Sequence, residues 1–223
     1  MNLPNKLTVI RLIMVPIFMA VMLVPIFTNF CPAVDITLNL FGAVLFIGAS
    51  VTDLLDGKIA RKHNLITDFG KFLDPLADKF LVIGALLCIF MANSMDGNKP
   101  MSVLFFATLV IVIFRELAVT SIRLVASSSG GVVIAANILG KIKTVVSIVA
   151  VSAAIIEPYL WKLLMYLFNF EWKFLMYIFH FKWEWVIGFP PITWTATALA
   201  IYFTIHSGIN YIVNAWKFLD PQK

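Results

Sequence analysis

The feature that most constrains this chain is a series of six long apolar windows that follow one another from near its start almost to its end. They cover residues 7–27, 36–55, 72–92, 102–124, 138–159 and 192–215. A helix needs about 20 mostly apolar residues to cross the hydrocarbon core of a bilayer. Of the 223 residues, 61% are hydrophobic and 13% are charged, which is far more apolar than a soluble domain. The sequence therefore predicts an all-α integral membrane protein with six transmembrane helices and one membrane-embedded domain, residues 1–223.

The first window is predicted to remain in the mature protein. It ends at Phe30, Cys31 and Pro32 without the small-residue cleavage site of a signal peptide. The cysteines, Cys31 and Cys88, lie far apart and outside any CxxC or Cys/His pattern, so neither a zinc site nor a disulfide framework is predicted.

Basic residues predict the orientation of the chain, because cytoplasmic segments of membrane proteins collect Lys and Arg. With both termini inside, 13 of the 17 basic residues fall at or near the cytoplasmic side. Only Lys99, Lys162, Lys173 and Lys182 fall outside. We therefore expect a multi-pass protein of the cell membrane (inner or plasma membrane) with both termini in the cytoplasm. The net charge of +5 is mainly a topology signal, and no basic run indicates a nucleic-acid partner.

A segment dense in aromatic residues, 161–185, separates the last two windows, and Lys and Glu are interleaved with its aromatic side chains. Trp and Tyr prefer the level of the lipid headgroups, so an amphipathic interfacial element is expected. A partner-binding surface is the alternative.

Carboxylates gather around the end of the second window and the start of the third. Asp53 and Asp56 are three residues apart, and Asp74 and Asp78 are four apart, so each pair lies on one face of a helix. A short polar stretch between the pairs predicts a hairpin that brings them face to face. Ionisable residues at membrane depth are candidates for a functional site. The active site is therefore expected at this end of the bundle, facing the cytoplasm.

Four carboxylates this close together would repel one another unless cations lay between them. Ligands that are all oxygen suit hard cations such as Mg²⁺ or Mn²⁺, whereas zinc prefers His and Cys. Two such ions can hold the attacking and leaving oxygens of a phosphoryl transfer. Gly57 and the small Ala60 would leave room for a phosphate or nucleotide. The planar guanidinium group of Arg61 can donate paired hydrogen bonds to phosphate oxygens.

Single residues of this cluster also have ordinary structural explanations. Asp74 before Pro75 is the pattern of a helix cap followed by proline at the first helical position. Asp68 is expected in the turn of the hairpin as a solvated aspartate. A divalent-cation transporter would also explain membrane carboxylates, but it needs polar residues along a path through several helices. A structural scaffold would leave the Asp spacing unexplained.

The spacing matches a known pattern without a gap. The motif D-x2-D-G-x2-A-R-x8-G-x3-D-x3-D resembles the signature of the CDP-alcohol phosphatidyltransferase family. It is formed here by Asp53, Asp56, Gly57, Ala60, Arg61, Gly70, Asp74 and Asp78. The resemblance implies a six-helix membrane fold, commonly homodimeric. It also implies an enzyme that transfers a phosphatidyl or related group from a CDP-linked donor to an alcohol, with CMP leaving.

The resemblance also implies roles for single residues. The metal ligands would be Asp53, Asp56, Asp74 and Asp78, with Asp78 also the general base. Gly57, Ala60 and Arg61, together with Asp53, would lie against the CDP part of the donor.

The flanking segments resemble the branch of the family that uses CDP-diacylglycerol as donor and sn-glycerol 3-phosphate as acceptor. Near the start of the chain, Asn5, Thr8 and Arg11 would help to bind the nucleotide or its diphosphate. The blocks 114–124 and 139–144 carry four cations that would bind the acceptor phosphate: Arg115, Arg123, Lys141 and Lys143. Topology alone also places Lys and Arg at such helix ends. Serine, inositol phosphate or another lipid remains open as the acceptor.

Overall fold

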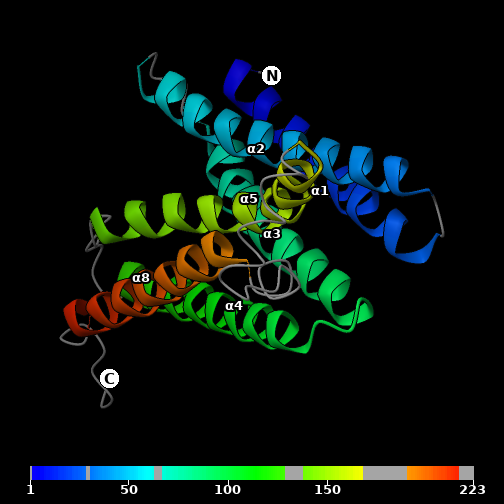
Figure 1. The fold of residues 1–223 in the computed structure, drawn as a ribbon. Coiled ribbons are helices and arrows are strands. Elements are labelled where there is room, and N and C mark those ends of the chain that lie inside the picture. Colours follow the sequence, from blue (N-terminus) through cyan, green and yellow to red (C-terminus); the bar gives the residue numbers. More distant parts are fainter. Residues whose placement is uncertain (1, 29–30, 63–66, 129–137, 168–189, 216–223) are drawn as a thin grey trace.

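The computed structural model describes residues 2–28, 31–62, 67–128, 138–167 and 190–215. Within these residues the chain forms six helices, shown in Figure 1. They are α1 (Leu3–Phe27), α2 (Pro32–Lys62), α3 (Asp68–Met95), α4 (Lys99–Ser128), α5 (Ile138–Leu167) and α8 (Pro191–Ala215). Each is long and apolar enough to cross a membrane, so the six-helix prediction is confirmed.

The helix boundaries follow from local chemistry. Proline is the first residue of α2 and of α8, where its fixed φ and missing N–H cost nothing. The side chain of Thr67 caps α3 by accepting a hydrogen bond of 3.1 Å from the backbone N–H of Gly70. Between α3 and α4 the chain turns at Gly97, whose φ of 74° favours glycine.

The start of α3 corrects one alternative from the sequence. Because the helix begins at Asp68 with Thr67 as its cap, Asp74 and Pro75 lie inside the helix. The interpretation of Asp74 as a helix cap is therefore wrong. Asp68 opens the helix rather than lying in a loop.

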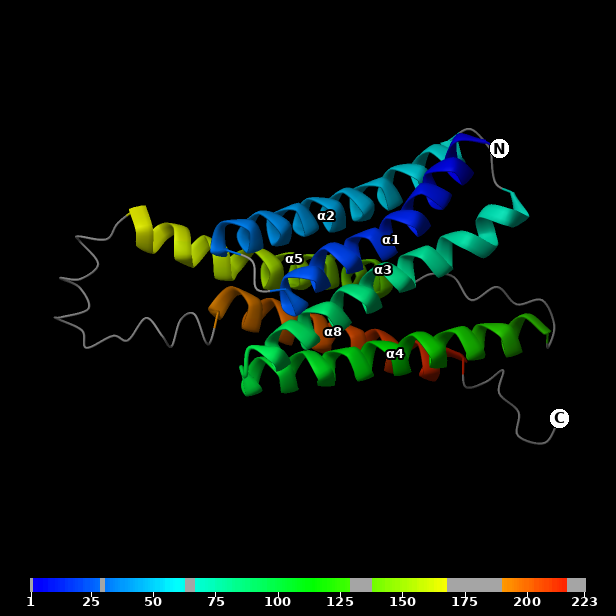
Figure 2. The same ribbon diagram turned by 90° about the vertical axis from the view of Figure 1, so that its right-hand side faces the viewer.

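The helices pack as an antiparallel bundle whose outer faces are apolar. In Figure 2 they run along one common direction, with α1 between α2 and α3, and with α8 beside α4. The core is made of side chains such as Phe18, Phe46 and Phe105, each almost fully buried. Val103, Phe114 and Val213 are exposed, as expected of side chains that face lipid.

The order of the helices places two sets of helix ends together. The starts of α1, α3 and α5 and the ends of α2, α4 and α8 lie at one end of the bundle, here called the site end (Figure 2). Residues 161–167, the first part of the aromatic segment 161–185, lie at the opposite end. They extend α5 as far as Leu167, and residues 168–185 lie outside the described part of the chain.

Candidate functional site

The two acidic pairs of the motif come from helices that meet at the site end. Asp53 lies in the last third of α2, and Asp74 and Asp78 lie in the first turns of α3. Asp53 has Asp74 among its charged neighbours, and Asp78 has Asp53 among its own. The predicted approach of the pairs is thus found for three of the four carboxylates. The backbone of Asp56, Gly57, Ala60 and Arg61 continues α2, but their side chains lie outside the described part of the chain.

The first helix binds both acidic pairs directly. The Thr8 hydroxyl donates a hydrogen bond of 2.6 Å to Asp74, and the Arg11 guanidinium forms an ion pair of 2.5 Å with Asp53. Thr8 and Arg11 are three residues apart, so they lie on one face of α1, and both are almost completely buried. A buried arginine needs a partner charge, and Asp53 provides it. In this structure these residues orient the acidic cluster.

Asn5, the third residue predicted on this face, fixes the start of α3. Its Oδ1 accepts a hydrogen bond of 2.9 Å from the hydroxyl of Thr67, the residue that caps α3. Gly70 of the motif makes this contact possible, since a Cβ on Gly70 would lie 2.9 Å from the same Asn5 oxygen. The glycine is therefore explained by the close approach of α1 and α3.

The donor chemistry of the acidic cluster fits a hard divalent cation. The side chains of Asp53, Asp74 and Asp78 offer only carboxylate oxygens, the ligands that Mg²⁺ and Mn²⁺ prefer. Among the side chains that the structure describes, no group of three or more His, Cys, Asp or Glu is arranged to hold a metal ion. The fourth predicted ligand, Asp56, is not among those side chains. The metal site therefore stays a prediction.

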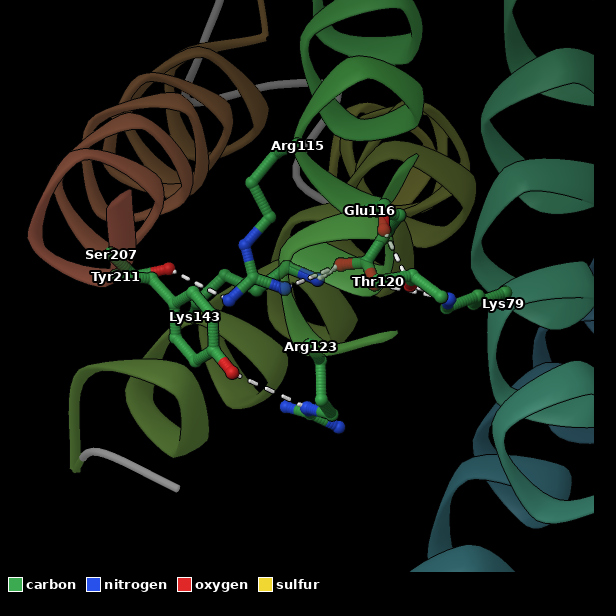
Figure 3. A network of polar contacts seen from close by, with 8 residues as sticks. All are labelled: Lys79, Arg115, Glu116, Thr120, Arg123, Lys143, Ser207 and Tyr211. Atoms are coloured by element: carbon green, nitrogen blue, oxygen red, sulfur yellow. Dashed lines mark hydrogen bonds and ion pairs between the residues drawn. The ribbon is translucent and has the colours of Figure 1, made fainter. Parts of the chain in front are cut away.

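A second polar cluster, here called the basic cluster, is formed by side chains of α3, α4, α5 and α8 (Figure 3). Its centre is Glu116 of α4. One carboxylate oxygen of Glu116 accepts from Lys143 of α5 at 2.5 Å and from Arg115 at 2.8 Å. The other oxygen lies 4.0 Å from the Lys79 ammonium of α3, which also donates to Thr120 at 2.7 Å. Three cations from three helices thus meet at one carboxylate.

The last helix supplies the other wall of the basic cluster. Arg115 donates to the Ser207 hydroxyl at 3.0 Å, and Arg123 lies 3.4 Å from the Tyr211 hydroxyl. The Arg123 guanidinium also lies over the Tyr211 ring, 5.8 Å from its centroid. Figure 3 shows both arginines held between α4 and α8.

Three of the four predicted acceptor-site cations therefore meet in this cluster. Lys141 does not join them. Its side chain is exposed and makes no hydrogen bond or ion pair with the residues that the structure describes. Lys143 lies two residues further along α5 and so points to a different face, where it is buried.

Sequence reasoning missed five residues of this cluster: Lys79, Glu116, Thr120, Ser207 and Tyr211. A signal existed for Glu116, because a carboxylate within an apolar window marks a candidate functional residue. Lys79 follows Asp78 directly and was used only for topology. No pattern in the sequence singles out Ser207 or Tyr211, since their importance depends on where α8 packs.

Asp78 connects the two clusters. Its charged neighbours are Asp53 and Arg11 on the side of the motif, and Lys143 and Glu116 on the side of the basic cluster. A group bound to the acidic cluster and an anion bound to the basic cluster would therefore both lie near Asp78.

Comparisons with known proteins agree with this arrangement. The model of the CDP-alcohol phosphatidyltransferase family matches residues 1–205. The chain is 42% identical over 221 residues to "CDP-diacylglycerol--glycerol-3-phosphate 3-phosphatidyltransferase" of Bacillus subtilis (strain 168), which covers 98% of this chain and 97% of the relative. It is 35% identical over 164 residues to the protein of the same name from Wigglesworthia glossinidia brevipalpis, covering 73% of this chain and 78% of the relative.

A third relative carries a related name. "Probable phosphatidylglycerophosphate synthase" of Mycobacterium tuberculosis (strain ATCC 25618 / H37Rv) is 37% identical over 150 residues, which cover 67% of this chain and 64% of the relative. The family model covers far more than half of the sequence, and the first relative matches almost all of it. This protein therefore belongs to the CDP-alcohol phosphatidyltransferase family.

Proposed function

We propose that this protein is an enzyme that transfers the phosphatidyl group of CDP-diacylglycerol to sn-glycerol 3-phosphate, forming phosphatidylglycerophosphate and CMP. The observation that carries the proposal is the pair of clusters joined at Asp78: carboxylates on one side and converging cations on the other. The first suits the metal-bound diphosphate of a nucleotide donor, and the second suits an acceptor that carries its own phosphate. The names of the relatives from Bacillus subtilis and Wigglesworthia support this pair of substrates.

The donor would bind along α2 and the start of α1. Gly57, Ala60 and Arg61 are proposed to lie against the CDP moiety, with Asn5, Thr8 and Arg11 behind the aspartates. In this arrangement Thr8 and Arg11 keep Asp74 and Asp53 oriented towards the diphosphate. The acyl chains would extend between the apolar helix faces into the bilayer.

Divalent metal dependence is general in this family. Asp53, Asp56, Asp74 and Asp78 are proposed to hold two ions of Mg²⁺ or Mn²⁺. When bound, such ions neutralise the diphosphate charge and make CMP a better leaving group.

Asp78 is proposed to act as the general base. It would accept the proton of the 1-hydroxyl of glycerol 3-phosphate while that oxygen attacks the phosphorus bearing the diacylglycerol. A new P–O bond forms to glycerol phosphate as the P–O bond to CMP breaks. Because a carboxylate is a weak base towards an alcohol, proton transfer must accompany bond formation in the transition state.

The site end is proposed to face the cytoplasm, as the distribution of basic residues predicts. A homodimer in the cell membrane is proposed from the family resemblance. Residues 1–223 would then form one catalytic domain per subunit.

The test is CMP release by the purified protein in detergent. Release should require both CDP-diacylglycerol and glycerol 3-phosphate, stop with EDTA, and return with Mg²⁺ or Mn²⁺. Glycerol 3-phosphate should be preferred over glycerol and serine by about two orders of magnitude or more, because buried cations left without a phosphate are costly. The comparison includes myo-inositol phosphate, which carries a phosphate on a different alcohol. Equal turnover with serine or inositol phosphate would contradict the acceptor assignment but leave the family reaction intact.

A further inference from the structure

We propose that Glu116 is a positioning residue that sets both the geometry and the net charge of the site for the acceptor phosphate. The inference rests on the proposed function, since it concerns the same basic cluster. Glu116 is not one of the predicted site residues, yet it contacts more of the cluster than any of them. Its role would be indirect: it holds the cations that bind the phosphate.

Glu116 joins cations from two helices. Lys143 and Arg115 belong to different helices, and long flexible side chains lose considerable entropy when they are fixed. A single Glu116 oxygen accepts from both, at 2.5 and 2.8 Å. Charge-assisted hydrogen bonds of this kind fix the position of the donors. The two cations are therefore held together before any substrate binds.

Lys143 and Arg115 have more hydrogen-bond donors than Glu116 uses. An ammonium group has three N–H donors and a guanidinium has five, whereas Glu116 uses one from Lys143 and one from Arg115. Ser207 accepts one more from Arg115. Both cations can therefore keep their contacts with Glu116 and still donate to phosphate oxygens.

Glu116 also lowers the positive charge of the basic cluster. Lys79, Arg115 and Lys143 lie around its carboxylate and Arg123 lies beside them, so four positive charges and one negative charge give a net charge of +3. A phosphate monoester carries about −1.5 to −2 near pH 7. Glu116 thus brings the charge of the cluster closer to that of the phosphate. Three cations without a carboxylate would also repel one another in a partly buried site.

Helix α8 completes the positioning. Gly208 allows the close approach, because a Cβ at Gly208 would lie 3.2 Å from the Arg115 Cγ. Next to it, the Ser207 hydroxyl accepts from the second nitrogen of the Arg115 fork. Arg115 is thus fixed from α4 by Glu116 and from α8 by Ser207 (Figure 3).

The test is a steady-state comparison of the wild type with Glu116→Gln. Glutamine keeps the shape and one acceptor oxygen but removes the charge. We expect the KM for glycerol 3-phosphate to rise about tenfold, with kcat within about threefold and the KM for CDP-diacylglycerol unchanged. Thr108→Val is the matched control, because Thr108 is buried in the same helix and its hydroxyl donates to the Leu104 carbonyl at 2.7 Å, away from the basic cluster. It should leave all three constants unchanged.

Each other outcome overturns the proposal. A lower KM for glycerol 3-phosphate would mean that Glu116 competes with the phosphate, and an unchanged KM would mean that it has no part in acceptor binding. An equal rise in the KM values for glycerol 3-phosphate and CDP-diacylglycerol would indicate a merely structural role. If Glu116→Gln does not fold, Ser207→Ala tests the same site, with an expected rise in the acceptor KM of about threefold. The proposed function is tested by the wild type alone. It is wrong if the wild-type protein releases no CMP in response to glycerol 3-phosphate.

Discussion

At the scale of single residues, the site depends on side chains that support the aspartates. Thr8 lies on a different helix from Asp74, yet its hydroxyl donates to that carboxylate at 2.6 Å. The sequence predicted Thr8 and Arg11 as site residues, but as groups that touch the nucleotide. Their actual contacts depend on the distance between α1 and the hairpin of α2 and α3, which no sequence spacing gives.

Thr8→Val should lower kcat by about 10- to 100-fold, the range found when residues that orient metal-binding carboxylates are removed. Valine has nearly the same shape, so the fold should persist, and the melting temperature in detergent should change little. Thr37→Val is the control, since Thr37 is exposed near the other end of α2 and bonds to the Ala33 carbonyl. An unchanged kcat in Thr8→Val would show that Asp74 needs no such support.

At the scale of helices, a buried carboxylate joins α5 to the start of α8 at the end opposite the site. Glu157 is almost fully buried and accepts three hydrogen bonds. They come from the Trp161 indole at 2.9 Å, the Ile192 amide at 3.0 Å and the Thr193 amide at 2.6 Å. The amides are unpaired at a helix start, so the carboxylate caps α8 and favours its N-terminal dipole.

Glu157→Ala should therefore destabilise the protein by at least about 2 kcal/mol, because hydrogen bonds to a charged group contribute about 1.5–3 kcal/mol each. Glu157→Gln keeps an acceptor oxygen and should lose less. The measurement is thermal unfolding in detergent. The same melting temperature in wild type and Glu157→Ala would rule out the cap as a stabilising contact.

A second contact between helices can be tested with paired glycines of α2. A Cβ at Gly42 would lie 2.6 Å from the Met22 sulfur of α1, whereas a Cβ at Gly48 meets nothing within 4 Å. Gly42→Val should cost about 1–3 kcal/mol through overpacking, and Gly48→Val should cost clearly less. Equal melting temperatures for the two variants would mean that the Met22 side chain can move aside at no cost in stability.

At the scale of the whole molecule, the sequence predicted the number of helices and the approach of Asp53, Asp74 and Asp78 at one end of the bundle. A long apolar segment that crosses a bilayer must pair its own backbone N–H and C=O groups, which a helix does. The motif residues are close in sequence, so their approach could be predicted as well. The basic cluster was predicted only in part. Arg115, Arg123 and Lys143 were identified, but Glu116, Ser207 and Tyr211 depend on how α4, α5 and α8 pack against one another, and Lys141 points elsewhere.

The orientation of the molecule can be tested with its two cysteines. Cys31 is exposed at the end opposite the site, between α1 and α2, while Cys88 is buried. If the site end faces the cytoplasm, a membrane-impermeant maleimide should label Cys31 in right-side-out vesicles and not in sealed inside-out vesicles. Cys31→Ser should abolish the labelling. The reverse pattern would invert the proposed topology.

The contact between Glu157 and α8 also has a consequence for how the protein is made. Two of the three groups bonded to this carboxylate belong to the last helix, which leaves the ribosome after the other five. Until then, Trp161 of the same helix is the one described partner that the carboxylate can have. The Glu157 carboxylate therefore gains two of its three hydrogen bonds only once α8 has been made, so the end of α5 and the start of α8 become joined late in synthesis.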